Sequence, residues 1–381
     1  MIKTFHSIEG LRGWLAWWVV IGHSFIIAGT PEWLPGQISN LIRRGDVAVN
    51  AFIIVSGFVV THLLMKKDEA YIPYIIRRVF RLWPVYLACI TFALTTTDAY
   101  RFTFIQLPFA EDIAMRSERL ATTDTNLTTH LALHATLLHG LIPESMLKFS
   151  SSSILAPAWS LSLEWQFYLL APLIIPLLFR RLHYIAMALL ASALIAYLTK
   201  SGLGNQYQYP SALFLSIHFF AIGIASRLLL DRVNSLNWKQ FAALVFLGVV
   251  FFAFYKLEAI IWLIWSIFVL YEQGSLQIGK KADEILNKIT RLITLNTIIS
   301  TIGKYSYSTY LIHIPIFTVF VYVGLNYLDI PQERTSIHAL LAASYVGTFV
   351  ASHLLYTYIE KPGIKIGTQV SAAFNHKNIR Q

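Results

Sequence analysis

Long apolar runs recur along the chain, separated by short polar or basic connections. Most approach the length of about 20 residues that a helix needs to cross roughly 30 Å of hydrocarbon. The pattern predicts an all-α fold, a polytopic transmembrane helical bundle of about ten spans. The runs lie at about 14–28, 47–65, 82–97, 158–179, 184–198, 211–230, 241–255, 260–271, 305–325 and 337–358.

The connections carry most of the basic residues, which predicts the orientation of the bundle. Cytoplasmic loops of membrane proteins are enriched in lysine and arginine. The connection between the second and third runs carries Lys66, Lys67, Arg77, Arg78 and Arg81. With ten spans and both termini in the cytoplasm, this connection, Arg180-Arg181 and the basic tail share one side. Arg43-Arg44 is the exception.

The longest polar interval, residues 98–156, mixes acidic and basic side chains that offset one another, and we expect it outside the membrane. Within it, the stretch 127–142 is apolar but interrupted by His130, His134 and His139. It is short for a span, so we expect a re-entrant or wet interfacial helix. His130 and His134 stand four residues apart and could share a metal, but no third ligand is nearby, so we expect none.

Composition excludes an ordinary soluble protein. The chain is 56% hydrophobic and only 13% charged, whereas soluble domains carry about 25% charged residues. The net charge of +10 could suggest nucleic acid. However, the cations lie in the connections and form no stripe with interleaved aromatic residues, so we expect membrane lipids and no nucleic acid as partners.

Four polar residues fall well inside the predicted spans: His23, Ser56, Glu164 and His313. An ionisable group near the bilayer midplane costs about 3 kcal/mol or more and is a candidate for function. His23 follows Arg12 by eleven residues, about 16 Å along a helix. The four residues together predict a polar cavity in which histidine transfers a proton, oriented by a carboxylate or hydroxyl. Alternatively, His23 is structural and Arg12 is only a topology charge.

Arg77, Arg78 and Arg81 cluster at the start of the third run. Guanidinium groups at a membrane mouth suit phosphates. The alternative is a topological role with anionic lipid headgroups.

Several segments together resemble acyltransferase family 3, a family of integral membrane acyltransferases. The resemblance runs in order from residue 6 to 362 and predicts a transmembrane acyltransferase domain at 1–362, followed by a short basic cytoplasmic tail at 363–381. Three departures are Glu9 and Asn50, where the family often has aspartate, and Trp165, where a second glutamate is common. The matching segments are IEGLRGWLAWWVVIGH, GDVAVNAFIIVSGFVV, YIIRRVFRLWPVYL, PAWSLSLEWQFYLLAPL, YSYSTYLIHIPI and YIEKP.

The resemblance implies transfer of an acyl group, often acetyl, from cytoplasmic acyl-CoA to a hydroxyl of a carbohydrate or other surface or exported acceptor. It implies that His23 is the catalytic base or acyl relay, and we expect Glu164 or His313 to orient it. Arg12 would assist at the donor end, and the three clustered arginines would hold CoA phosphates. Contacts with the substrate are expected from Ser56, Trp159 and Ser160.

Several points stay open at this stage. A proton-coupled transporter or a lipid-linked glycan flippase would also bury histidine and glutamate, and a non-catalytic assembly protein could keep the motifs. The resemblance implies a bacterial inner-membrane location. Many relatives carry an additional soluble domain, so we expect this chain to act alone or to pass its product to a partner. The acceptor, the acyl length, direct or acyl-enzyme transfer, and a homodimeric state are not determined by the sequence.

Overall fold

The computed structural model describes residues 5–67, 69–179, 182–200, 202–232, 238–274 and 279–378. Across these residues the regular structure is helical, without strands. The α-helices are α1 (His6–Ala28), α2 (Gly36–Ile42), α3 (Gly45–Lys66), α4 (Tyr71–Thr95), α5 (Thr97–Arg101), α6 (Ile113–Thr125), α7 (Leu127–Thr136), α8 (Trp159–Leu178), α9 (Leu182–Lys200), α10 (Leu213–Leu230), α11 (Trp238–Phe254), α12 (Lys256–Glu272), α13 (Lys280–Thr290), α14 (Thr297–Tyr327), α15 (Arg334–Leu355) and α16 (Lys361–Asn378). Shorter helical segments are η1 (Phe102–Gln106), η2 (His139–Leu141), η3 (Ala156–Ala158), η4 (Leu203–Gln206), η6 (Arg291–Leu295) and η7 (Tyr356–Glu360).

The all-helical membrane architecture predicted from the sequence is confirmed. Among the described residues, 7 helices are long and apolar enough to cross a membrane. They are α1, α3, α4, η3 with α8, α10, α14, and the continuous helix Arg334–Phe374. The other three predicted spans coincide with α9, α11 and α12, of which α11 and α12 are each 17 residues long. The count of ten and the cytoplasmic termini stay predictions, and Arg180-Arg181 lies outside the described residues.

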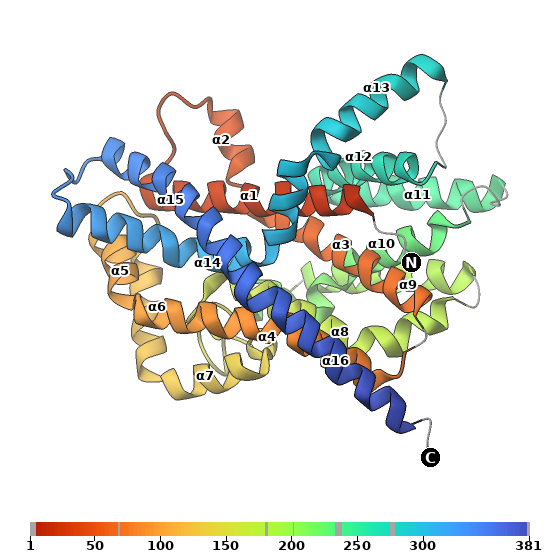
Figure 1. The fold of residues 1–381 in the computed structure, drawn as a ribbon, viewed down its shortest axis with the longest axis horizontal. Coiled ribbons are helices and arrows are strands. Elements are labelled where there is room, and N and C mark those ends of the chain that lie inside the picture. The colour runs from red at the N-terminus through yellow and green to blue at the C-terminus, as the bar shows by residue number, and fades with distance from the viewer. Residues whose placement is uncertain are drawn as a thin grey trace.

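Helix α1 runs through the middle of the bundle, packed against α14 and α3 (Figure 1). Glycines permit the close approach. A Cβ atom on Gly303 of α14 would clash with the backbone carbonyl of Glu9 in α1. A Cβ on Gly223 of α10 would likewise clash with the carbonyl of Ile54 in α3. Small residues at such crossings are typical of membrane helices, because apolar lipid supplies no hydrophobic force to join them and close packing must do so.

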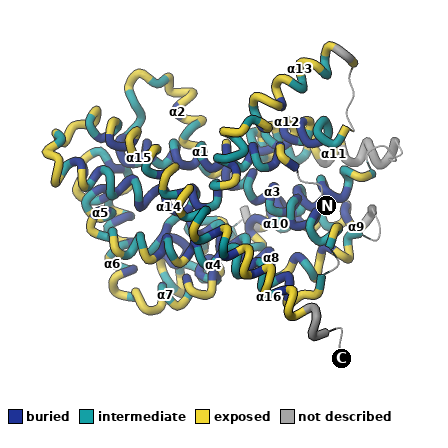
Figure 2. The backbone as a smooth tube through the Cα atoms, in the orientation of Figure 1, coloured by how far each residue is buried: buried dark blue, intermediate teal, exposed yellow. Residues whose placement is uncertain are grey.

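The distribution of buried residues agrees with this packing of the helices (Figure 2). Buried positions concentrate along α1, α3 and α10, whereas many large apolar side chains elsewhere are exposed. Examples are Met187 and Leu194 of α9 and Val249 and Phe254 of α11, each about 60% exposed. A soluble protein rarely exposes so many large apolar residues together. On a membrane bundle these side chains face lipid.

The predicted start of the third span near residue 82 is wrong. Helix α4 begins at Tyr71, so Arg77, Arg78 and Arg81 lie on the helix and not in a loop. Pro84 is therefore an interior residue, and it cannot donate the usual hydrogen bond to the carbonyl four residues before it, that of Phe80. Gly363 of α16 packs directly against that carbonyl. A Cβ atom at position 363 would lie only 2.7 Å from the Phe80 carbonyl oxygen.

The predicted boundary between residues 362 and 363 falls inside a helix. α15, η7 and α16 follow one another without a break. The described part of the predicted basic tail is helical and lies along α4. Gly367 packs there against the Phe80 ring.

The histidine-bearing stretch forms the ten-residue helix α7 and η2. Its interfacial position stays a prediction, but its histidines face the protein interior and not water. His130, His134 and His139 are all 0% exposed. His134 is 2.6 Å from the Tyr86 hydroxyl and 3.0 Å from the Ser153 hydroxyl, and its ring stacks on His139 with the centroids 4.0 Å apart. Nε2 of His139 lies 3.1 Å from the Ala158 carbonyl, whereas neither ring nitrogen of His130 has a hydrogen-bond partner among the described residues.

Candidate active site

Six helices, α1, α3, α4, α8, α10 and α14, surround a cavity of about 100 Å³. A water-sized group needs about 10–15 Å³ of such space, so roughly seven to ten of them would fit. Six of the ten predicted site residues line this cavity: Arg12, Ser56, Arg78, Arg81, Ser160 and Glu164.

Glu164 is the acceptor at the centre of the hydrogen bonding in the cavity. The Ser56 hydroxyl of α3 donates to its Oε1 across 3.0 Å, and Tyr168, one turn further along α8, donates to the same oxygen. The four-residue spacing places the tyrosine and the glutamate on one helix face. These donors hold the carboxylate in place at the cavity wall.

The cavity carries more positive than negative charge. Arg12 and Arg81 are attracted electrostatically to both Glu164 and Glu360. Neither they nor Arg78 lie within 4 Å of a carboxylate of the described residues. Three guanidinium groups therefore face two carboxylates, which favours an anionic ligand.

Arg78 is the most informative of the three. It is 7% exposed, and its guanidinium lies 5.3 Å and 5.2 Å from the ring centroids of Tyr74 and Tyr168. Its buried Nε has no hydrogen-bond partner in the described part of the chain. A buried unpaired donor is costly, so this nitrogen is a candidate for contact with a bound ligand.

Two of the predicted residues have other partners. Arg77 forms an ion pair with Glu69 and does not line the cavity. The Trp159 ring stacks on Tyr209, with centroids 5.4 Å apart and planes within 9°. Neither residue touches the cavity, so the arginine cluster divides into the cavity-lining Arg78 and Arg81 and the ion-paired Arg77.

His23 and His313 contact each other directly. Nδ1 of His23 lies 2.9 Å from Nε2 of His313, and the rings stack at 5.1 Å. Nδ1 of His313 lies 3.2 Å from the Thr309 carbonyl, which can only accept. His313 must therefore donate from Nδ1 and accept at Nε2, so His23 donates from its own Nδ1. Nε2 of His23 is left with a free lone pair, as a general base requires.

The histidine pair lies beside the cavity, separated from it by Tyr310. The Tyr310 ring lines the cavity, and its centroid is 6.3 Å from that of His313. Its hydroxyl accepts a hydrogen bond of 2.9 Å from Ser160. His313 is completely buried, whereas His23 is partly exposed. Among the predicted orienting partners, His313 contacts His23, while Glu164 serves the arginine-lined cavity.

Sequence reasoning missed several residues around the cavity. Tyr168, Tyr307 and Tyr310 line it, and Glu360 acts on its arginines while accepting a hydrogen bond of 2.9 Å from Ser308. Glu360 could have been identified from the sequence, because it stands in the YIEKP segment. The three tyrosines also stand in quoted segments, but aromatic residues are frequent throughout the chain, so their residue type did not distinguish them.

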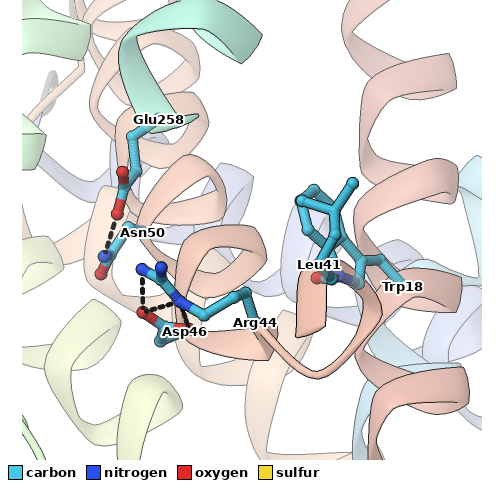
Figure 3. Close-up of polar contacts among 6 residues, drawn as sticks. All are labelled: Trp18, Leu41, Arg44, Asp46, Asn50 and Glu258. Atoms are coloured by element: carbon cyan, nitrogen blue, oxygen red, sulfur yellow. Dashed lines mark hydrogen bonds and ion pairs between the residues drawn. The ribbon is translucent and has the colours of Figure 1, made fainter. Parts of the chain in front are cut away.

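Two of the three departures from the family pattern, Asn50 and Trp165, have structural explanations. Asn50 donates a hydrogen bond of 2.9 Å to the buried carboxylate of Glu258, near the ion pair of Arg44 with Asp46 (Figure 3). An aspartate at position 50 would set two carboxylates against each other. Trp165 packs edge-on against Trp83 in the core, with centroids 4.5 Å apart.

Among the described residues, no group of three or more histidine, cysteine, aspartate or glutamate side chains is placed to hold a metal ion. His134, half of the candidate metal pair, is bonded to hydroxyl groups on both ring nitrogens.

Comparison with known proteins places this geometry in context. The chain is 25% identical over 392 aligned positions to the O-acetyltransferases OatA of Staphylococcus aureus strains NCTC 8325 / PS 47 and COL. The alignment covers 96% of this chain but only 58% of each relative, so the chain spans little more than half of their length. No solved structure matches it significantly. The family model described as an acyltransferase domain matches residues 5–357, and the chain therefore belongs to this family of acyltransferases, acyltransferase family 3.

Proposed function

We propose that this membrane acyltransferase moves an acetyl group from cytoplasmic acetyl-CoA to a hydroxyl of a carbohydrate or other exported acceptor in a bacterial inner membrane. Acyl transfer follows from the family, and the name of the relatives favours O-acetylation. The observation that carries the proposal is the His23–His313 pair next to an arginine-lined cavity. The family gives no support to the transporter or flippase alternative.

Arg12, Arg78 and Arg81 are the proposed donor-binding residues. Guanidinium groups bind phosphate oxygens through paired hydrogen bonds, and the unpartnered Nε of Arg78 supplies one such donor. A cavity of about 100 Å³ suits the thioester end or one diphosphate of acyl-CoA and not the whole molecule. The rest of the donor would extend beyond it. Arg77 would then act through its ion pair with Glu69.

His23 is the proposed general base. Its free Nε2 takes the proton of the acceptor hydroxyl as that oxygen attacks the thioester carbonyl. The C–O bond forms, the C–S bond breaks, and the CoA thiolate leaves and recovers the proton from His23. His313 acts as a positioning residue, because its Nε2 accepts from the His23 Nδ1–H. That bond strengthens when the first ring becomes charged.

An acyl-enzyme route would use the same nitrogen as a nucleophile. The acetyl group would move first to Nε2 of His23 with release of CoA, and then to the acceptor. The two routes differ in one respect that can be measured. CoA release without an acceptor, as a burst of one equivalent, supports the acyl-enzyme route.

The test uses the purified full chain in lipid nanodiscs, radiolabelled acetyl-CoA and a mixture of bacterial surface oligosaccharides. We expect label to enter the oligosaccharides and His23→Gln to lower the rate by about 100-fold or more, the range of general-base catalysis. His353→Gln is the matched control, because His353 is exposed and its ring, within the described part of the chain, hydrogen-bonds to Tyr305 away from the cavity. Full activity of folded His23→Gln would refute the proposal, as would proton-coupled uptake in vesicles without acetyl transfer.

A further inference from the structure

Two arginines of α6 are buried and do not line the donor cavity. Arg116 is 9% exposed and Arg119 is 3% exposed. The sequence shows enough acidic residues in this interval to offset them. The structure pairs those acids with other cations.

Each neighbouring carboxylate that forms an ion pair does so with a more exposed partner. Arg43 forms an ion pair with Glu111 at 2.5 Å, and Arg101 forms one with Asp124 at 3.2 Å. Lys148 forms an ion pair with Glu118. In the described part of the chain, no carboxylate lies within 4 Å of Arg116 or Arg119. Two buried guanidinium groups therefore stand side by side on α6 without an ion-pair partner.

The contacts they do make leave their donor edges largely open. Arg116 donates to the Glu111 carbonyl at 2.9 Å and to the Tyr100 hydroxyl at 3.4 Å, and its guanidinium lies 4.3 Å from the Phe104 centroid. Arg119 donates to the same hydroxyl. A guanidinium carries five N–H donors, and a ring on its face leaves the edge free. Burial lowers the pKa of both arginines, because it disfavours the charged form.

Their position ties them to the proposed chemistry. The charge of Arg116 acts on the His23 imidazole, and the Glu111 amide donates to the Ile26 carbonyl across 3.0 Å, which fixes this segment to the last turn of α1. Arg12 lies eleven residues before His23 on that helix and Ile26 three residues after it. Arg12 and the attachment point of the segment that leads into α6 therefore lie on either side of His23 along α1.

We propose that Arg116 and Arg119 bind an anionic group of the acceptor, a phosphate or a carboxylate. The acceptor hydroxyl would then reach Nε2 of His23 while its anionic group is held on α6. This inference rests on the proposed function for the identity of the acceptor. Two guanidinium forks side by side suit an oxyanion that can accept several hydrogen bonds at once. The acceptor class is accordingly an acidic or phosphorylated carbohydrate and not a neutral one.

The experiment measures binding without requiring catalysis. The purified full chain, in nanodiscs of the neutral lipid phosphatidylcholine, is heated with glucose 6-phosphate, glucuronate or glucose at one ionic strength set with sodium chloride. We expect at least one of the two anionic probes, and not glucose, to raise the unfolding temperature. Arg116→Gln and Arg119→Gln should weaken that binding by about tenfold or more, the loss expected for a charge-assisted pair.

Two further variants guard against trivial outcomes. Arg101→Gln removes an exposed arginine close to α6 and should leave binding unchanged. Arg119→Lys keeps the charge but loses the fork, so it should fold even if Arg119→Gln does not, and it should still weaken binding. Equal shifts with glucose, no shift with any probe, or unchanged binding in the variants would overturn the inference. Stabilisation only by phosphatidylglycerol nanodiscs would identify a lipid site and would overturn it as well. A probe shift without acetyl transfer would instead contradict the proposed function alone.

Discussion

Replacing His313 with leucine would remove the group that we assign to holding His23. In the structure, Nε2 of His313 accepts from Nδ1 of His23 at 2.9 Å, and the His313 ring is itself fixed by the Thr309 carbonyl at 3.2 Å. Leucine fills a similar volume in this buried position but accepts no hydrogen bond. His23 would keep its place on α1, but neither its tautomer nor its ring orientation would be fixed.

The expected magnitude follows from the change in charge during the reaction. Before proton transfer, the bond joins two neutral rings and contributes about 0.5–1.5 kcal/mol, whereas with a charged donor it contributes about 1.5–3 kcal/mol. The part gained only in the transition state is therefore about 1–2 kcal/mol. At 1.36 kcal/mol per factor of ten, this difference lowers kcat by roughly 5- to 30-fold. Loss of the correct tautomer adds to this, so we expect about 10- to 100-fold.

The assay is steady-state acetyl transfer by purified variants, with kcat and the KM for acetyl-CoA determined separately. The KM should stay within about twofold of its original value, because His313 does not line the arginine cavity. His313→Gln is the matched variant, since its side-chain oxygen can accept from His23, and it should recover much of the lost rate. The proposed role is refuted if His313→Leu keeps the original kcat, or if glutamine rescues nothing while both variants fold normally.

Three other perturbations test the site and the fold. Arg78→Met should raise the KM for acetyl-CoA by about tenfold, and Arg77→Met should change it less because that side chain pairs with Glu69; equal effects would contradict the donor assignment. Gly223→Ala should lower the unfolding temperature in detergent, whereas Gly248→Ala should not, since nothing lies within 4 Å of a Cβ there; equal melting would exclude the proposed close crossing. Burial lowers the pKa of His139 to about 4, below its value of about 6.5 in an unfolded chain. The unfolded state therefore binds more protons in this interval, and stability should fall as pH drops from about 6.5 to about 4. His139→Gln should weaken that dependence, and an unchanged pH profile would count against it.

The sequence alone predicted the class of the protein and much of its donor site. Apolar runs of membrane-spanning length leave few alternatives to helices, because backbone groups in lipid must be satisfied within the segment. Polar residues at depth are costly, so Ser56 and Glu164 could be selected before any contact was known, and both line one cavity. The basic connections also predict the orientation of the bundle in the membrane, and this orientation stays a prediction.

Only the tertiary structure decided which partner each of these residues meets. It joined His23 to His313, separated in sequence by 290 positions, and it turned Arg78 into the cavity while Arg77 turned to Glu69. It also buried three histidines expected in water and left Arg116 and Arg119 without the acids that the sequence appeared to supply. Burial in a membrane bundle depends on helix rotation and on close glycine crossings, which arise between segments far apart in the chain. The hydrophobic periodicity of a single segment cannot predict helix rotation or these crossings.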